Sequence, residues 1–405
     1  MKPMKRFEQV SAYLDGLGLF HMDLNLGRME RFWERRAIPD LPVVHVVGTN
    51  GKGSTAAFFA SLARAHGLKV GLFGSPHFLT MRERVQVNRA MLSEREWLAL
   101  ANDILSVPGS EALTYFEFQT CLAMLAFGRA RVDVAVMEAG LGGRFDATNV
   151  FAPELTLFTP IGMDHEAHLG RTLSAIARDK AGALHTGGCG VTGPQDPAAL
   201  IELQDRAEAV GARLMYSVDM AEPVSAARLG LSGIHQAVNA RLALAGWHWF
   251  AAGHGIRSQV ETEIFGLESA FLPGRFQRTC IGGREVILDG AHNPHALTAL
   301  AAALRDSDIR PGCVIFSCMA DKDLDTMAPL VRELTDGPIL AVPMEYDRAC
   351  PTGTLAAVLG ERTVVLDSLE AALEAGSNHP SPTLVCGSLY LLADFYTLYP
   401  HFLTI

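Results

Sequence analysis

Short apolar runs alternate with longer segments of helical character along the chain. The run VVHVVG (43–48) predicts a buried strand, and a glycine-rich turn and a helix over about 54–66 are expected to follow it. Strands that are apolar along their whole length and alternate with helices are typical of βαβ units in a mostly parallel sheet covered on both faces. Further strands are expected at KVGLFG (69–74), VDVAVMEAG (132–140) and ELTLFTPIG (154–162), and a helix at FEFQTCLAMLAFGRA (116–130).

The pattern changes in FLPGRFQRTC (271–280), where proline and glycine interrupt the helical character. A second alternation of strands and helices begins after this segment. We therefore expect two α/β domains, 1–273 and 280–405, joined by a linker at 274–279. The second alternation consists of REVILDGAHNP (284–294), LTALAAALR (297–305), CVIFSCM (313–319), PILAV (338–342) and TLVCGSLYLLADFY (383–396).

Composition narrows the class of protein. Of the 405 residues, 49% are hydrophobic and 19% are charged, which is enough for two large cores. The net charge of −10 argues against a nucleic-acid partner, and no apolar run reaches the roughly 18 residues that a membrane span needs. Seven scattered cysteines form no C-x-x-C pair, and no apolar core of a signal peptide follows the first lysines. We expect a cytoplasmic protein with unpaired thiols and no membrane partner.

The stretch HVVGTNGKGST (45–55) carries the most informative chemistry. It runs from a strand through a glycine-rich turn to a lysine, two hydroxyl residues and a helix. Glycines let consecutive backbone N–H groups face one anion, and the helix dipole adds to the attraction. The chain has only 6 lysines against 28 arginines, so Lys52 is a scarce residue. We expect it to reach the β- and γ-phosphates of a nucleotide, with Ser54 or Thr55 as a Mg²⁺ ligand.

The turn departs from the general phosphate-loop pattern, because Val46 stands where a glycine is expected and Gly53 separates Lys52 from Ser54. A turn rich in glycine and asparagine without any ligand is the alternative. However, the segment GTNGKGS resembles the phosphate loop of the Mur ligase superfamily, in its folylpolyglutamate synthase/dihydrofolate synthase branch.

Other motifs of that family recur in the same order over essentially the whole chain. Each motif alone is weak, but the ordered set is highly specific. It consists of GSPHFLTMRERVQV (74–87), YFEFQT (115–120), EAGLGGRFDATN (138–149), MDH (163–165), ARDKAGAL (177–184), HQAVNARLALAG (235–246), LPGRFQ (272–277), DGAHNP (289–294), DKD (321–323) and CGSLYLLADF (386–395).

The resemblance implies a fold and an activity. The fold is a P-loop NTPase-like domain with a mostly parallel sheet, followed by a smaller, Rossmann-like α/β domain. The activity is an ATP-dependent ligation that joins L-glutamate to a pteroate or folate carboxylate through an acyl phosphate, with Mg²⁺. A monomer that acts on small molecules is expected. Whether the acceptor is dihydropteroate, a reduced folate or both stays open, as does the length of the polyglutamate chain.

Metal ligands are expected where predicted strands end. Glu138 ends one strand, and Ser75 and His165 follow two others, so we expect the three near the edge where open α/β sheets bind ligands. The resemblance implies that Ser75, Glu138 and His165 bind Mg²⁺ together with Ser54, although each alone would more often be an ordinary hydrogen-bonded residue. It also implies that Lys180 is carbamylated, whereas a surface salt bridge with Asp179 is the alternative. Lys52, His165 and Lys180 are the expected catalytic residues.

Nucleotide contacts are expected from both halves of the chain, on the basis of the resemblance. Arg275 would otherwise form an interdomain salt bridge, and Asp289 would otherwise cap the helix after Pro294. The expected nucleotide-binding residues are Thr49, Asn50, Gly51, Lys52, Gly53, Ser54, Thr55, Asn239, Arg275, Asp289 and His292.

Two segments match the family's pteroate site, where aromatic rings would stack on a pterin and a carboxylate would pair with its amino-pyrimidine edge. Their residues are Thr114, Tyr115, Phe116 and Glu117, then Phe145, Asp146 and Ala147. An ordinary amphipathic helix start is the alternative for the first segment. HMDLNLGRME (21–30) resembles the family's IDLGLxRV but departs from it at Asn25 and Gly27. Asp321, Lys322, Asp323 and Ser388 are expected near the glutamate or the nucleotide.

Rival classes fit less well. A GTPase would need N-K-x-D, and no asparagine directly precedes a lysine. Mur ligases that act on UDP-linked peptides usually carry a further N-terminal domain, for which we expect no room before residue 48. The glycines at 140–143 do not predict an NAD site, because an acidic residue about 20 positions further on, at the end of a second strand, is missing. A binding protein with a degenerate site is the remaining alternative.

Overall fold

The computed structural model describes residues 3–18 and 25–404. Contacts divide the chain into two compact units. The first unit comprises Met1–Val224 and Val238–Ala270, and the second comprises Ser225–Ala237 and Phe271–Ile405. The segment Ser225–Ala237, which the expected first domain 1–273 included, therefore groups with the second unit.

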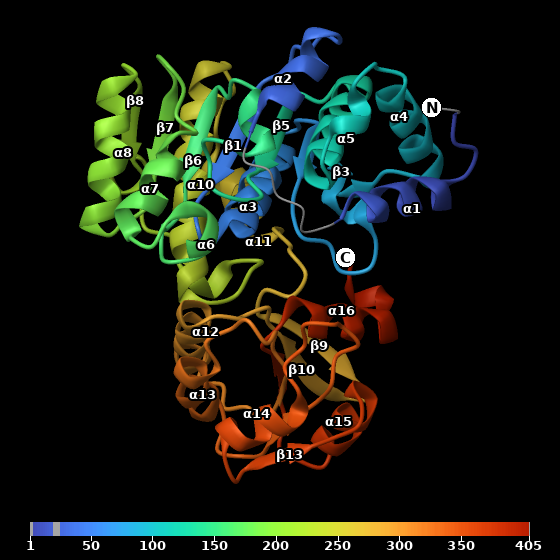
Figure 1. The fold of residues 1–405 in the computed structure, drawn as a ribbon. Coiled ribbons are helices and arrows are strands. Elements are labelled where there is room, and N and C mark those ends of the chain that lie inside the picture. The colour runs from blue at the N-terminus through green and yellow to red at the C-terminus, as the bar shows by residue number, and fades with distance from the viewer. Residues whose placement is uncertain (1–2, 19–24, 405) are drawn as a thin grey trace. The chain divides into compact units, whose positions relative to one another are not determined.

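The first unit is built around an eight-stranded sheet with the order β4-β3-β2-β5-β1-β6-β7-β8 (Figure 1). Neighbouring strands are parallel except for the pairs β2–β3 and β3–β4 at one edge. The strands are β1 (Val43–Val47), β2 (Val70–Phe73), β3 (Val85–Val87), β4 (Ala90–Met91), β5 (Val134–Glu138), β6 (Leu155–Phe158), β7 (Cys189–Thr192) and β8 (Arg213–Tyr216). Every residue of β1, β5 and β6 is buried, which explains why their sequences are mostly apolar, with His45, Glu138 and Thr156 as the polar exceptions.

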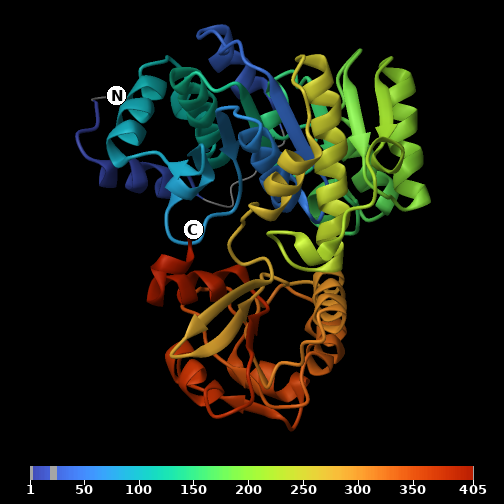
Figure 2. The same cartoon turned by 180° about the vertical axis from the view of Figure 1, so that it is seen from behind.

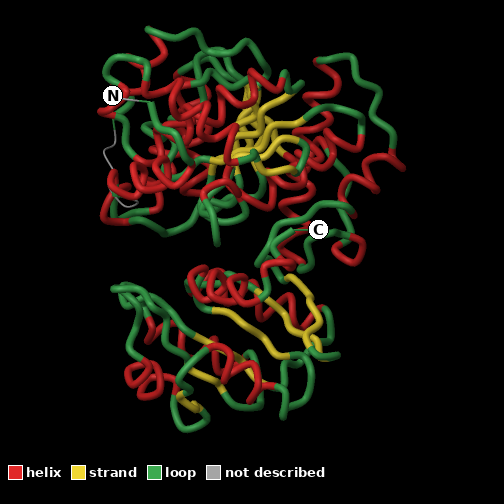
Figure 3. Tube along the Cα trace, turned by 90° about the vertical axis from the view of Figure 1, so that its right-hand side faces the viewer, coloured by secondary structure: helices red, strands yellow, loops and turns green. Residues whose placement is uncertain are grey.

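Helices cover both faces of this sheet, and Figure 3 shows the strands gathered between them. One face carries α1 (Phe7–Leu17), α2 (Gly27–Glu34), α4 (Glu94–Leu105), α5 (Tyr115–Ala130), α7 (Leu173–Ala181) and α8 (Pro197–Ala209). Helices α3 (Lys52–Ala65), α10 (Ile234–Gly253) and α11 (Val260–Glu268) pack together, and the yellow α10 crosses the sheet in the view from behind (Figure 2). Two short helices, α6 (Glu166–Leu169) and α9 (Ser217–Met220), lie in connections.

The second unit has a six-stranded sheet with the order β13-β12-β11-β14-β10-β9, parallel except for the β9–β10 pair. Its strands are β9 (Gln277–Ile281), β10 (Arg284–Leu288), β11 (Cys313–Phe316), β12 (Ile339–Ala341), β13 (Thr363–Val365) and β14 (Thr383–Cys386). Its helices are α12 (Pro294–Asp306), α13 (Leu324–Glu333), α14 (Thr352–Leu359), α15 (Leu369–Gly376) and α16 (Leu389–Leu398). The predicted class, two α/β units with mostly parallel sheets, is confirmed.

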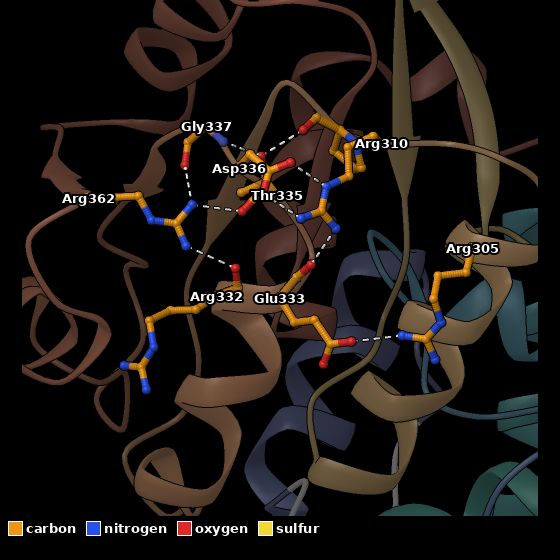
Figure 4. A network of polar contacts seen from close by, with 9 residues as sticks. Arg305, Arg310, Arg332, Glu333, Thr335, Asp336, Gly337 and Arg362 are labelled. Carbon is orange, nitrogen blue, oxygen red and sulfur yellow. Dashed lines mark hydrogen bonds and ion pairs between the residues drawn. The ribbon is translucent and has the colours of Figure 1, made fainter.

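An arginine network closes the end of α13 in the second unit (Figure 4). Arg362 donates hydrogen bonds to the carbonyl oxygens of Arg332, Thr335 and Gly337, at 3.0, 2.8 and 3.1 Å. These carbonyls lie at and just beyond the last turn of the helix, where partners within the helix are lacking. The guanidinium group therefore joins the end of α13 to the segment that precedes β13.

Candidate active site

The phosphate loop connects β1 to α3, and its backbone is fixed by close neighbours. Gly51 has φ +87°, in the left-handed region, and a Cβ atom there would lie 2.3 Å from Oδ1 of Asn239. The backbone N–H groups of Thr49 and Asn50 both donate to the carbonyl oxygen of Pro160, at 3.1 and 3.4 Å. Only glycine fits at position 51, because a side chain would be both strained and in collision. Asn239 therefore lies against the phosphate loop, and both were predicted to bind the same nucleotide.

The amides of the first turn of α3 have no acceptors within the helix, so they are available to an anion. Lys52 opens this helix, and its Nζ donates to the carbonyl oxygen of Thr49 at 3.1 Å. Ser54 and Thr55 are buried in the same turn. The Thr55 hydroxyl has no hydrogen-bond partner within the described part of the chain. The helix start therefore combines amides that lack acceptors within the helix, an ammonium group and a buried hydroxyl without a partner among the described residues.

Lys180 lies in α7 and points to the beginning of the phosphate loop. Its Nζ donates a 2.8 Å hydrogen bond to the carbonyl oxygen of Gly48, and the residue is only 4% exposed. Burial, reinforced by the positive charge of Lys52, lowers the pKa of Lys180 to about 7, although Asp179 and other acids oppose this. The alternative of a surface salt bridge is wrong, because the amine is buried.

The residues predicted to bind a metal come from the same edge of the sheet. Glu138 ends β5, and its Oε2 accepts a hydrogen bond from the backbone N–H of Ser75, at 3.1 Å. His165 precedes α6 in a left-handed conformation, with its side chain 47% exposed and 3.7 Å from Asp164. Among residues 3–18 and 25–404, no three His, Cys, Asp or Glu residues form a metal site. A metal held by Glu138 and His165 would therefore need hydroxyl, phosphate and water oxygens as further ligands, and oxygen ligands suit Mg²⁺.

The first predicted acceptor segment begins α5, where Thr114 and Glu117 form a capping box. Both oxygens of Glu117 also accept hydrogen bonds from Arg28, at 2.9 Å. Tyr115 is only 3% exposed and lies under the guanidinium of Arg84, 5.4 Å from the ring centroid. The Phe116 ring packs closely on Gly140. The carboxylate of Glu117 is thus fully used within the protein. Residues 21–24 of the segment that contributes Arg28 lie outside the described residues.

The second acceptor segment belongs to the loop 140–149, between β5 and β6. Asp146 is buried, and its carboxylate accepts hydrogen bonds from the backbone N–H groups of Leu141 and Thr148, at 2.8 and 3.0 Å. Burial raises the pKa of Asp146, while these hydrogen bonds oppose the shift. Ala147 is also buried, but Phe145 is 38% exposed. Phe145 is therefore the residue of this segment that is open to a ligand.

The predicted nucleotide residues of the second unit lie just before β9 and just after β10. Asp289 accepts hydrogen bonds from the backbone N–H groups of Phe276 and Ala291, both at 2.8 Å. Arg275 donates to the carbonyl oxygen of Gly274, and His292 Nδ1 lies 2.7 Å from that of Gly290. The helix α12 is capped by Asn293, so the alternative role of Asp289 as its cap is wrong. Asp323 and Ser388 cap α13 and α16, which gives both residues a structural role.

Comparisons with known proteins agree with this architecture. The profile "Mur ligase, glutamate ligase domain" matches residues 274–388. The dihydrofolate synthase/folylpolyglutamate synthase of Bacillus subtilis is 32% identical over 96% of this chain and 98% of its own length. The chain belongs to the folylpolyglutamate synthase/dihydrofolate synthase family. This confirms the family and the enzyme class, an ATP-dependent ligase, that the motifs predicted.

Solved structures of the family share the whole fold. The folylpolyglutamate synthase of Mycobacterium tuberculosis, complexed with ADP, is 27% identical and superposes with a TM-score of 0.86 over 97% of this chain and 98% of its own. A bifunctional folylpolyglutamate synthase/dihydrofolate synthase from Yersinia pestis, complexed with AMPPNP and a Mn ion, is 29% identical, with a TM-score of 0.86 over 98% of both chains. Within the described residues, no helix has both the length and the apolar character to cross a membrane.

Sequence reasoning missed two groups that shape the site of this family member. Glu83 accepts hydrogen bonds from the backbone N–H groups of Phe78, Leu79 and Thr80, at 2.7–2.8 Å, and so holds the loop that begins with Ser75. His45 lies in the motif HVVGTNGKGST but was read only as part of a strand. The one signal for His45 was a polar residue inside an otherwise apolar strand.

Proposed function

We propose that this chain joins L-glutamate to the carboxyl group of a dihydropteroate or reduced-folate acceptor, with ATP converted to ADP and phosphate. Membership of the family supports this, as do relatives that bind ADP, or AMPPNP with Mn. The observation that carries the proposal is the Lys180–Gly48 hydrogen bond, which joins a buried amine to the phosphate loop. We further propose that the protein acts as a cytoplasmic monomer.

The reaction has two steps. The acceptor carboxylate attacks the γ-phosphate of ATP, which gives an acyl phosphate and ADP. The amine of glutamate then attacks the acyl carbon and expels phosphate. The ammonium of Lys52 and the amides at the start of α3 stabilise the negative charge that spreads over the phosphate oxygens. No side chain has to form a covalent bond, so catalysis rests on positioning and electrostatics.

Four residues would hold the metal ion: Ser54, Ser75, Glu138 and His165. When bound, Mg²⁺ supplies positive charge that neutralises the triphosphate. The carboxylate of Glu138, which the backbone N–H of Ser75 holds in place, and the buried hydroxyls of α3 fit such an ion, because they are hard oxygen ligands. Glu138 would carry the only formal negative charge among these four.

Lys180 has the environment that carbamylation requires. With its pKa near 7, a large share of the amine is neutral at neutral pH. The neutral amine attacks CO₂ to form a C–N bond and releases one proton, which leaves a carbamate on Nζ. The new oxygens would support the metal side of the site. We assign the removal of the proton from the glutamate ammonium to His165 or to this carbamate.

The acceptor would bind against Phe145, with Tyr115 and Phe116 beneath the site. Since the carboxylates of Glu117 and Asp146 are occupied by internal hydrogen bonds, they would shape the pocket, and stacking on an aromatic ring would supply the affinity. Thr114, which caps α5, and the buried Ala147 would contribute to the acceptor site by fixing the backbone around it.

The proposal is tested by ATP turnover with labelled L-glutamate, measured separately with dihydropteroate and with tetrahydrofolate. Release of ADP that depends on both glutamate and an acceptor, with label entering the acceptor, is the expected result. If neither acceptor stimulates ADP release in the presence of magnesium, the proposal is wrong. Size-exclusion chromatography with light scattering tests the monomer.

A further inference from the structure

A chain of buried polar groups runs from β1 to the loop 140–149. The Nε2 atom of His45 lies 2.7 Å from Oγ1 of Thr148, and that hydroxyl in turn donates a hydrogen bond to Asp146. His45 and Thr148 are completely buried, and Asp146 is 4% exposed. Three polar side chains in a protein core are costly unless each is paired, so such a chain is fixed in geometry.

The direction of the hydrogen bonds can be worked out. Both oxygens of Asp146 accept backbone N–H groups, as expected of a carboxylate. The single hydroxyl proton of Thr148 points to Asp146, so its oxygen must accept from His45 Nε2–H. Burial, with the nearby His185, lowers the pKa of His45 to about 3, so the ring is neutral and carries its one proton on Nε2. Its Nδ1 has no partner within the described residues.

The loop 140–149 also forms hydrogen bonds with α7, the helix that contains Lys180. The backbone N–H of Gly143 donates to Oδ1 of Asp179, and that of Arg144 donates to the Asp179 carbonyl oxygen, both at 2.9 Å. A Cβ atom at Gly142 would lie 2.3 Å from the same Asp179 carboxylate, so the fit is tight. Lys180 follows Asp179 and bonds to Gly48.

These contacts close a ring. It leaves β1 at His45, passes through Thr148, Asp146 and the loop 140–149 to α7, and returns through Lys180 to Gly48, three residues after its start. A change at His45 therefore reaches the loop directly, whereas the phosphate loop is also held by Asn239 and Pro160.

We propose that His45 is a positioning residue that, through Thr148 and Asp146, sets the loop 140–149 and its exposed Phe145 in place for the acceptor. The inference rests on the proposed function, since it takes the acceptor to bind at this loop. His45 touches neither nucleotide nor acceptor in this scheme. It sets the acceptor site relative to the phosphate loop through the ring of contacts.

The test compares His45→Leu, which removes the donor, with His45→Gln, whose side-chain amide can donate to Thr148. We expect His45→Leu to raise the KM for the acceptor by about tenfold, the size of one hydrogen bond between neutral groups. The KM for ATP should stay within about twofold, and His45→Gln should restore most of the loss. His254→Leu is the control. Among the described residues, the ring nitrogens of His254 form hydrogen bonds only with Glu154, which is not part of this chain of polar groups.

Equal changes in both KM values, or no rescue by His45→Gln, would overturn the inference. If His45→Leu does not fold, Thr148→Val against Thr148→Ser makes the same comparison of a missing and a retained hydroxyl.

Nitrogen NMR of the imidazole of His45 tests the inference without a measurement of turnover. His45 should keep the neutral Nε2–H form from about pH 5 to about pH 8, and an Nδ1–H form would overturn the inference. If the wild-type protein shows the Nε2–H form but no ligase turnover, the proposed function is contradicted and the hydrogen-bond chain from His45 is not.

Discussion

Lys180 and Gly48 are 132 residues apart in the chain, yet the ε-amino group of Lys180 donates a 2.8 Å hydrogen bond to the carbonyl oxygen of Gly48. This contact joins the end of α7 to the point where the phosphate loop leaves β1. It removes the amine from water, and burial is the main cause of its lowered pKa. The same burial makes Lys180 a source of pH-dependent stability.

The free energy of unfolding should rise with pH because of Lys180. Between about pH 7 and about pH 10, the unfolded chain binds a proton here that the folded chain lacks. The substitution Lys180→Met removes this contribution. In CO₂-free buffer, the gain in unfolding free energy from pH 7 to pH 9 should be about 2 kcal/mol larger in wild type than in the variant. Urea titrations at the two pH values measure it, and equal gains would contradict the assigned pKa.

Lys52→Ala should abolish ADP release, by about a hundredfold or more, because the ammonium group stabilises charge only when a triphosphate reacts. Folding should be little changed, since the Nζ hydrogen bond to Thr49 lies in a partly exposed turn. Lys5→Ala is the control, because Lys5 is an exposed lysine of the same unit. Turnover of Lys52→Ala near the wild-type rate would refute the role of the loop.

Gly51→Ala and Gly67→Ala form a matched pair. Both glycines have φ +87°, but a Cβ atom at Gly51 would lie 2.3 Å from Asn239, whereas none of the described atoms is within 4 Å at Gly67. Gly67→Ala should lose about 1 kcal/mol from backbone strain alone. Gly51→Ala should lose more stability and, in addition, its affinity for ATP. Thermal unfolding with and without MgATP measures both effects, and similar behaviour of the two variants would contradict the packing of Asn239.

Glu117→Ala should lower the free energy of unfolding by about 3 kcal/mol, because it leaves the guanidinium of Arg28 buried without its carboxylate. The two side chains are 6% and 13% exposed. Glu94→Ala breaks the pair with Arg82, in which Glu94 is 59% exposed, and should change stability by less than about 1 kcal/mol. Denaturant unfolding compares the two variants. A loss at Glu117 no larger than that at Glu94 would show that the buried pair is dispensable.

Much of the fold could be predicted from the sequence, because the patterns that indicate strands and helices involve residues close together in the chain. The predicted strands 43–48, 69–74, 132–140 and 154–162 correspond to β1, β2, β5 and β6, and the helix expected from about residue 54 begins at Lys52. The ordered motifs identified the family, which the comparisons confirmed. The strands β7 and β8 were not predicted. Both have only four residues; β7 contains Gly190 and β8 is partly exposed, so neither shows a continuous apolar run.

The sequence by itself determined the order of the strands and helices, the glycine positions of the phosphate loop and the residue types near the sheet edge. These depend on neighbours a few positions apart. Only the tertiary structure decided that Lys180 is buried, that Glu117 and Asp146 are used internally and that His45 bonds to Thr148. Burial, pKa and hydrogen-bond partners are set by groups far away in the chain, which meet only when parallel strands and their helices have packed together.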